Sequence, residues 1–452
     1  MKLTDYEQTL MKRLEQRASK TRQQDRLNRL YYLGKQPIQF LGLRLRDEWL
    51  AQAFPMTWCR TLANVVVERQ QVLRLLRRGE FTEDERLRAA WDASDMDSQS
   101  QRLKMDLAMY GRCFISVAMT DRGPRMVAEP VRAMTLLTDE LGETLAGMRQ
   151  YWDEDNREVR RVLYLPNETV IISRSEVVDR IQHGLGRVPI VMAVMGDIDG
   201  DLRGTSVFEP VKRLADMSAE TLLNARVALE TTASPTKVML DAAMDIVDQN
   251  GNKVEAWEMF YDSVLTVFSG ADEQGKQVKA DVKQLPGTDL SGFFKTIEML
   301  GQQASSATGL PMRMLGHVTA NPPSEMTVRG EESRLVRLVE NYNDALGAAI
   351  GWALSISERL QTGVWPDDGS IDVSWRDPGT PTQAQQADAL TKYVQTGMMS
   401  RRTALEELGW SDTRIDREME RLEKEADPMG MAYRELARPV VPDSEPPAEV
   451  ES

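Results

Sequence analysis

Cysteine and histidine are both scarce in this chain, which has only two of each among its 452 residues. Cys59 and Cys113 lie far apart and form no Cys-x-x-Cys pair, so the sequence predicts two buried, reduced thiols and no disulfide framework. His183 and His317 stand at neither a metal-ligand spacing nor a Ser/His/Asp spacing. We therefore expect no metal site, no cofactor and no catalytic triad.

Long apolar segments are missing as well. Uncharged apolar runs, such as the one near residues 188–194, are far shorter than the roughly 20 residues that a membrane-spanning helix needs. The N-terminal sequence MKLTDYEQ has no apolar core of the kind that a signal peptide carries. The sequence predicts a soluble protein that is made in the cytoplasm and contacts no membrane.

Positive charge is in deficit, because the formal net charge is −14 at pH 7. Phosphate contacts from Lys and Arg supply most non-specific affinity for nucleic acid, so this balance argues against a protein that grips DNA or RNA broadly. Aromatic residues make up 6% of the chain and form no stacking run, which argues against base recognition. The charge balance is +8 over residues 1–80 and −6 over 401–452. This asymmetry indicates either two solvated faces or oppositely charged regions that meet in an assembly.

The apolar residues that are present predict a mainly helical α+β fold. Residues 1–110 carry mostly helical patterns, whereas residues 112–178 carry short apolar runs between turn clusters, as strands do. The next helix is expected over about 206–232, with Ser206 and Glu209 at capping-box spacing. The first half of the chain therefore predicts a helical region, a β module and a long helix.

The rest of the chain alternates in the same way. Residues 237–284 contain strand-like runs and an Asn-Gly turn, which predict a small α/β insertion. Residues 371–375 alternate apolar and polar side chains as a strand, and short helices follow a capping box at Thr380. The residues after 428 are rich in proline and acid, so we expect them to be disordered.

The stretch 285–332 is the most informative one, because it predicts a helix, a firmly bounded loop and a second helix. Thr288 and Asp289 can cap the first helix, which Gly309 and Pro311 end. Its apolar positions recur at helical spacing: Leu290, Phe293, Ile297, Leu300, Ala304 and Ala307.

The second helix follows two prolines that force an extended backbone. Ser324 is its expected N-cap, and its apolar stripe continues to about residue 361, a length of roughly 50 Å. The loop before it carries no acidic residue between Pro311 and Glu325. A helix of this length is too long for a small core, so we expect several other helices or strands to pack along it.

Two motifs suggest chemistry, but their contexts fail. Residues 270–276 fit the GxxxxGK pattern of a phosphate-binding loop, yet Gln277 replaces the Ser or Thr that would hold Mg²⁺, and no helical pattern follows. Asp197, Asp199 and Asp201 suggest a cation loop, but the spacing does not fit an EF-hand. We predict a surface turn at each position and no enzymatic activity.

Several segments along the chain carry a resemblance to a known family. They are RLNRLYYLGKQPI (26–38), NVVVERQQVLRL (64–75), HGLGRVPIVMAVMG (183–196), GTSVFEPVKRLADMSAETLLNARVALETTASP (204–235), QQASSATGLPMRMLG with NPPSEMTVRGEE (302–316 and 321–332), and VSWRDPGTPTQAQQADALTKYVQTGMMSRRTALEELGWS (373–411). In this order they resemble the siphophage-type portal proteins of tailed bacteriophages, which connect head to tail. The resemblance covers most of the chain except about 240–284 and the residues after 428.

This resemblance implies a portal-type fold with a wing, stem, clip and crown that assembles into a channelled ring. Carried onto this sequence, the implied parts are a wing at 1–204, stem helices at 205–232 and 289–309, a clip at 233–288, a channel loop at 310–325, a long wing helix and return strand at 326–378, a crown at 379–428 and a disordered tail at 429–452.

The resemblance also implies a function in phage particles. A ring of about twelve copies at one capsid vertex would form the channel for packaging and ejecting double-stranded DNA. The implied partners are the terminase large subunit, a head-completion adaptor, scaffold and major capsid protein. Residues expected to meet DNA without sequence specificity are Arg313, His317, Thr319 and Asn321. The alternative is a head-completion or minor capsid protein without its own channel.

Overall fold

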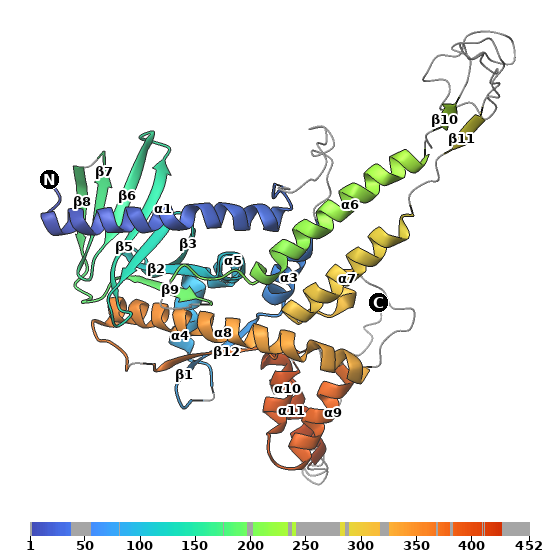
Figure 1. Ribbon diagram of the computed structural model, residues 1–452. Coiled ribbons are helices and arrows are strands. Elements are labelled where there is room, and N and C mark those ends of the chain that lie inside the picture. The colour runs from blue at the N-terminus through green and yellow to red at the C-terminus, as the bar shows by residue number, and fades with distance from the viewer. Residues whose placement is uncertain are drawn as a thin grey trace, which may run out of the picture. The chain divides into compact units, whose positions relative to one another are not determined.

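The protein is described here from a computed structural model, which covers residues 2–37, 56–80, 82–174, 176–196, 202–233, 237–240, 281–284, 289–316, 325–367, 369–379, 383–408, 410 and 412–426. These residues belong to two compact units, Met1–Gly379 and Thr380–Ser452, and each unit is described by itself. Both contain the elements drawn in Figure 1. Helices and antiparallel sheets make up the first unit, so the predicted α+β class is confirmed.

Helix α1 (Asp5–Leu33) begins and ends where its sequence dictates. Thr4 and Glu7 form a capping box, in which the Glu7 N–H donates to Thr4 Oγ1 at 3.3 Å and the Thr4 N–H donates to Glu7 Oε2 at 2.7 Å. Gly34 adopts the left-handed conformation, with φ at 64°, and ends the helix. Arg180 Nη1 donates to Glu7 Oε1 at 2.7 Å and thereby joins this helix to the sheet that it covers.

Five antiparallel strands form a sheet in the order β4-β5-β6-β7-β8. Their bounds are Met134–Thr138, Thr144–Asp153, Glu158–Tyr164, Glu168–Ser173 and Glu176–Gln182. Figure 1 shows α1 lying across this sheet. Leu10, Met11 and Leu14 of α1 pack against one face of this sheet. Met148 pairs with Leu163 across β5 and β6, and both side chains lie in that buried layer. The predicted β module is confirmed, although its last strand ends at residue 182 instead of 178.

A second sheet of three antiparallel strands forms the centre of the larger core. Its order is β3-β2-β9, with β2 at Arg112–Thr120, β3 at Gly123–Glu129 and β9 at Ile190–Val194. Helices α3 (Trp58–Glu68), α4 (Glu85–Ala93) and α5 (Met96–Tyr110) contribute to the same core. Cys59 and Cys113 are free and buried, as predicted, and burial raises the pKa of the Cys59 thiol to about 12.

Helix α8 (Glu325–Thr362) has 38 residues, which corresponds to about 57 Å. Its predicted apolar stripe is confirmed, because five side chains at helical spacing are buried in the main core: Leu335, Val339, Tyr342, Leu346 and Ile350. The helix contacts β2, β3 and β9 along its length. It therefore holds the central sheet on one side.

A two-stranded sheet beside α8 corrects one prediction. Strand β12 (Ile371–Trp375) was expected, but its partner β1 (Val72–Arg77) lies in the region predicted to be mostly helical. The sequence of β1, VLRLLR, is too short to distinguish a strand from a helix by periodicity. Gly351 allows α8 to approach this sheet, since a Cβ there would lie 2.8 Å from the Ile371 carbonyl oxygen.

Helices α6 (Lys212–Ala233) and α7 (Ser291–Thr308) contact each other, and short strands β10 (Lys237–Leu240) and β11 (Asp281–Gln284) pair between them in the sequence. The capping box predicted for α6 is wrong. The Ser206 hydroxyl donates to the Ala108 carbonyl at 3.4 Å, and a short 3₁₀ turn, η1 (Glu209–Val211), precedes the helix. The turn predicted at residues 250–251 lies outside the described residues.

The second unit contains three short helices, α9 (Gln383–Gln395), α10 (Arg401–Glu407) and α11 (Asp412–Ala426). Ser400 caps α10, because its Oγ accepts a hydrogen bond from the Thr403 N–H at 3.1 Å. The capping box predicted at Thr380 lies outside the described residues. Within the described parts of both units, no helix is long and apolar enough to span a membrane.

Candidate functional site

The candidate site consists of the α6–α7 helix pair, which Figure 1 shows side by side, and residues 309–316, which follow α7 and contact it. Small side chains are buried along the two paired helices. They include Ala215, Ala219 and Ala225 on α6 and Gly301 and Ala304 on α7. Small residues let two helix backbones approach closely, and one leucine on each helix, Leu223 and Leu300, is buried as well.

The apolar stripe predicted for α7 is partly wrong in detail. On α7, Leu300 and Ala304 are buried as expected, but Ala307 is exposed. On α6, Ala225 is buried, whereas Leu229 is half exposed. The pattern identified the helices but not which positions the partner helix covers.

Each helix also carries a large, exposed apolar side chain on the side opposite some of its buried residues. Met217 is two positions from the buried Ala219, and Met299 is two positions from the buried Gly301. Two positions correspond to a rotation of about 200° around a helix. Met217 and Met299 are both about half exposed, so the outer sides of the pair carry apolar surface.

A buried polar cluster fixes the start of α6. Lys212 Nζ donates to Asn28 Oδ1 of α1 at 2.6 Å and also hydrogen-bonds the Glu209 carboxylate. The Tyr31 hydroxyl donates to Asp216 Oδ2 at 2.6 Å. Burial raises the pKa of Asp216, and the hydrogen bond from Tyr31 opposes that rise. Helix α6 is thereby attached to α1 by specific contacts.

The segment just before α6 is held as tightly. Arg112 Nη2 forms a buried bidentate pair with Asp25, at 2.9 and 2.7 Å, and its Nη1 donates to the Arg203 carbonyl at 2.6 Å. Gly204 crosses Gly111 so closely that a Cβ on Gly204 would lie 2.3 Å from the Gly111 carbonyl oxygen. Residues 202–206 therefore have one position relative to β2.

The end of α7 is defined by Gly309 and by α8. Gly309 has φ at 75°, and a Cβ there would lie 2.8 Å from Cβ of Arg334. Arg334 Nη1 in turn donates to the Ser306 carbonyl at 2.7 Å, which satisfies one of the free carbonyls at the helix end. The predicted helix end at Gly309 is confirmed.

Glu332 is the most constrained charge in this region. Glu332 lies on α8 and is 4% exposed. Its carboxylate accepts hydrogen bonds from two guanidinium groups. Arg313, in the 3₁₀ turn η3 (Met312–Leu315), hydrogen-bonds one carboxylate oxygen, and Arg69 Nη2 lies 3.3 Å from the other. Arg69 also donates to the Pro378 carbonyl at 3.1 Å. The carboxylate thus joins η3, α8 and the end of α3.

The four residues predicted to meet DNA stand differently in the structure. Arg313 is described, and it is bound to Glu332. His317, Thr319 and Asn321 lie outside the described residues, as do Ser324 and the motifs at 197–201 and 270–276. Asp289 accepts a hydrogen bond from the Ser291 N–H at 2.9 Å, but the N-cap of α7 is Leu290, and no side chain caps the helix there, so the cap predicted at Asp289 is wrong. Thr288 lies outside the described residues.

Sequence reasoning missed Glu332 and Arg334. The signal for Glu332 was present, because it stands three and seven positions before Leu335 and Val339 and so continues their buried stripe. A carboxylate in such a stripe needs a cationic partner, since burying an unpaired charge is very unfavourable. Among the residues that the structure describes, no group of three or more His, Cys, Asp or Glu side chains could hold a metal ion.

Comparison with known sequences gives one family and two similar proteins. The family described as "Phage portal protein, SPP1 Gp6-like" matches residues 17–428. The portal proteins of Mycobacterium phages D29 and L5 are each 28% identical to this chain over 447 residues, covering 93% of this chain and 90% of the relative.

Solved structures give a more distant likeness. A chain in the neck of an empty gene transfer agent particle is 15% identical, with a TM-score of 0.48, and the match covers 82% of this chain and 95% of that chain. A chain in the virion of a native gene transfer agent particle is 14% identical, with a TM-score of 0.46, 85% of this chain and 99% of that chain being covered.

Proposed function

The chain belongs to the phage portal protein family of the SPP1 Gp6-like type, and from this membership we propose that its copies form a ring at one capsid vertex. The ring encloses a channel through which double-stranded DNA enters during packaging and leaves during ejection. The observation that carries the proposal is the family match over residues 17–428, which spans nearly the whole chain.

The outer sides of the α6–α7 pair support ring formation. Met217 and Met299 are half exposed and lie on different helices. In a ring with head-to-tail contacts, every copy meets two neighbours through two different surfaces. Burial of these side chains against neighbouring copies would remove apolar surface that a single copy leaves in water.

The assignment of the chain's parts follows the family architecture. In this proposal α6 and α7 are the stem, residues 233–288 the clip, residues 310–325 the channel loop, and α9 to α11 the crown. The remaining elements, from α1 to β9 together with α8 and β12, form the wing. The long α8 suits this arrangement, because it contacts the central sheet and also holds the end of α7.

The charge of the chain supports a channel in which DNA slides. A net charge of −14 disfavours broad contact with phosphates, since cationic contacts supply most non-specific affinity. The ion pair with Glu332 gives Arg313 a role in anchoring the base of the channel loop. We assign contact with the DNA backbone to His317, Thr319 and Asn321, in a loop without acidic residues up to Glu325.

In this proposal a partner protein, and not this chain, supplies the energy that drives DNA into the capsid. The terminase large subunit supplies ATP hydrolysis while it is docked on the clip, and a head-completion adaptor replaces it when the head is full. Scaffold and major capsid protein contact the ring within the virion. The chain itself provides the channel and the docking surfaces and carries out no catalysis.

Native mass spectrometry combined with negative-stain imaging tests the proposal. We expect a ring of about twelve copies with an open centre. A monomer, or a ring without a channel, would contradict the proposal and favour a head-completion or minor capsid protein. Purified protein should also hydrolyse no ATP, and turnover that persists through purification would contradict the absence of catalysis.

A further inference from the structure

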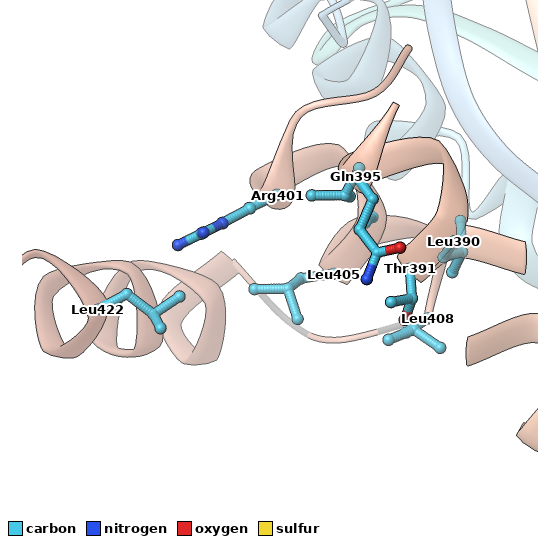
Figure 2. Close-up of a pocket in the computed structure, with 9 residues that line it drawn as sticks. Leu390, Thr391, Gln395, Arg401, Leu405, Leu408 and Leu422 are labelled. Carbon is cyan, nitrogen blue, oxygen red and sulfur yellow. The ribbon is translucent and has the colours of Figure 1, made fainter. Parts of the chain in front are cut away.

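The second unit contains a cavity of about 380 Å³ between its three helices. Figure 2 shows side chains from α9, α10 and α11 around it. Leu390 comes from α9, Leu405 and Leu408 come from α10 and the residue that follows it, and Leu422 comes from α11. The cavity is therefore lined mainly by aliphatic side chains.

The three helices do not fill this space themselves. Ala404 and Ile415 are buried between them, but Leu405, Leu408 and Leu422 remain partly open to water. A unit of this size has a small core, so each partly exposed leucine costs it a sizeable fraction of the free energy that burial of apolar side chains provides. An apolar segment bound in the cavity would bury these leucines and add that stabilising free energy.

One cation stands at the mouth of the cavity. Arg401, the first residue of α10, lines the cavity and is exposed. Its neighbour Arg402 pairs with Glu406 and Asp416, whereas Arg401 has no ion-pair partner among the described residues. The site therefore fits a segment with bulky aliphatic side chains and a carboxylate close behind them.

The chain carries such a segment shortly after this unit's last helix. Residues 439–443 read Pro-Val-Val-Pro-Asp, so two β-branched residues lie between prolines and an acidic residue follows. Proline restricts the backbone to extended conformations before binding, which lowers the entropy cost of seating the segment in a groove. We propose that Pro439–Asp443 occupies the cavity, with Val440 and Val441 against the leucines and Asp443 at Arg401.

The length of the connecting segment allows this contact. Leu422 lines the cavity four residues before α11 ends at Ala426. Thirteen residues then separate Ala426 from Val440, and a chain of that length can reach at most about 45 Å. Helix α11 has 15 residues, or about 22 Å, so the segment can return along it to the cavity. Tethering at this range gives an effective concentration on the order of millimolar.

Hydrogen exchange of the full chain, read by mass spectrometry, tests the proposal. In the variant Val440→Asp with Val441→Asp, amides of α10 and of the end of α11 should exchange at least about fivefold faster than in the unchanged chain. Ala448→Asp with Val450→Asp is the matched control, because it adds the same two negative charges outside the segment. Equal exchange in the unchanged chain and the double variant would overturn the proposal.

A charge exchange tests the contact at the mouth of the cavity. Arg401→Glu and Asp443→Arg should each speed exchange of α10, and the two changes together should restore slow exchange. Failure of the double variant to restore protection, while each single variant loses it, would overturn the pairing. The proposal concerns one copy of the chain and does not depend on ring formation, so imaging of rings cannot decide it.

Discussion

Arg313 binds Glu332, a buried carboxylate 19 positions further along the chain, and this contact joins the end of α7 to the start of α8. Arg69 reaches the same carboxylate from the end of α3. Two cations thus share one buried carboxylate, with the Arg69 side chain 14% exposed and the Arg313 side chain 34% exposed. Removing the anion would leave two guanidinium groups without their main partner.

We predict that Glu332→Ala lowers the free energy of unfolding by about 3 kcal/mol, within the range measured when one partner of a buried ion pair is removed. Glu340→Ala is the matched control, because Glu340 lies exposed on the same helix. Chemical denaturation followed by circular dichroism measures both variants. Equal stability of the two would show that the Glu332 contacts contribute little.

Gly309 gives a second prediction, which concerns the backbone. Alanine at this position would need φ at 75° and would bring its Cβ to 2.8 Å from Cβ of Arg334, so we expect a loss of roughly 1–3 kcal/mol. Gly292→Ala on the same helix is the control, since a Cβ there meets nothing within 4 Å. That variant should be neutral or more stable. The comparison of thermal midpoints decides the matter.

Asp106 predicts how stability depends on pH. Burial raises its pKa to about 7, and its Oδ2 has no hydrogen-bond partner among the described residues. The folded state therefore holds a proton that the unfolded state releases near pH 4, so this group makes stability fall as pH rises from about 4 to about 7.

Asp106→Asn should remove that fall. We expect the variant to match the unchanged protein near pH 4 and to exceed it above pH 7 by on the order of 2–4 kcal/mol. Denaturation curves between pH 4 and 8 measure the difference, and Asp344→Asn, at an exposed position, is the control. A constant difference across this range would contradict the predicted titration.

Local patterns predicted the elements of this protein well where one helix or strand carries its own signal. The apolar stripe of α8 and the Gly309 end of α7 follow from spacing within a few residues, and both are confirmed. The pairing of β1 with β12 and the contact of Arg69 with Glu332 join residues that lie far apart in the sequence. No periodicity carries that information, which explains why β1 was predicted as helix and Glu332 was missed.

Met299 gives the prediction that depends on assembly. It is 49% exposed on the outer side of α7, so Met299→Asp should leave the single copy folded but reduce the fraction of rings by at least about tenfold. Met119→Asp is the control, because Met119 is 54% exposed on β2, away from the proposed stem contacts. Native mass spectrometry compares the two, and intact rings in Met299→Asp would contradict a stem interface at this position.

Separating the channel loop from its anchor gives the last prediction. Deleting residues 317–321 should leave rings and thermal stability unchanged, because Arg313 and Glu332 still hold the base of the loop. Packaging or retention of DNA should fail, since the residues assigned to touch the DNA backbone are gone. Arg313→Ala should instead lower the thermal stability, because it removes the contact with Glu332 that holds the base of the loop. Particles assembled with each variant are assayed for nuclease-protected DNA, and normal DNA content after the deletion would rule out the proposed role of the loop.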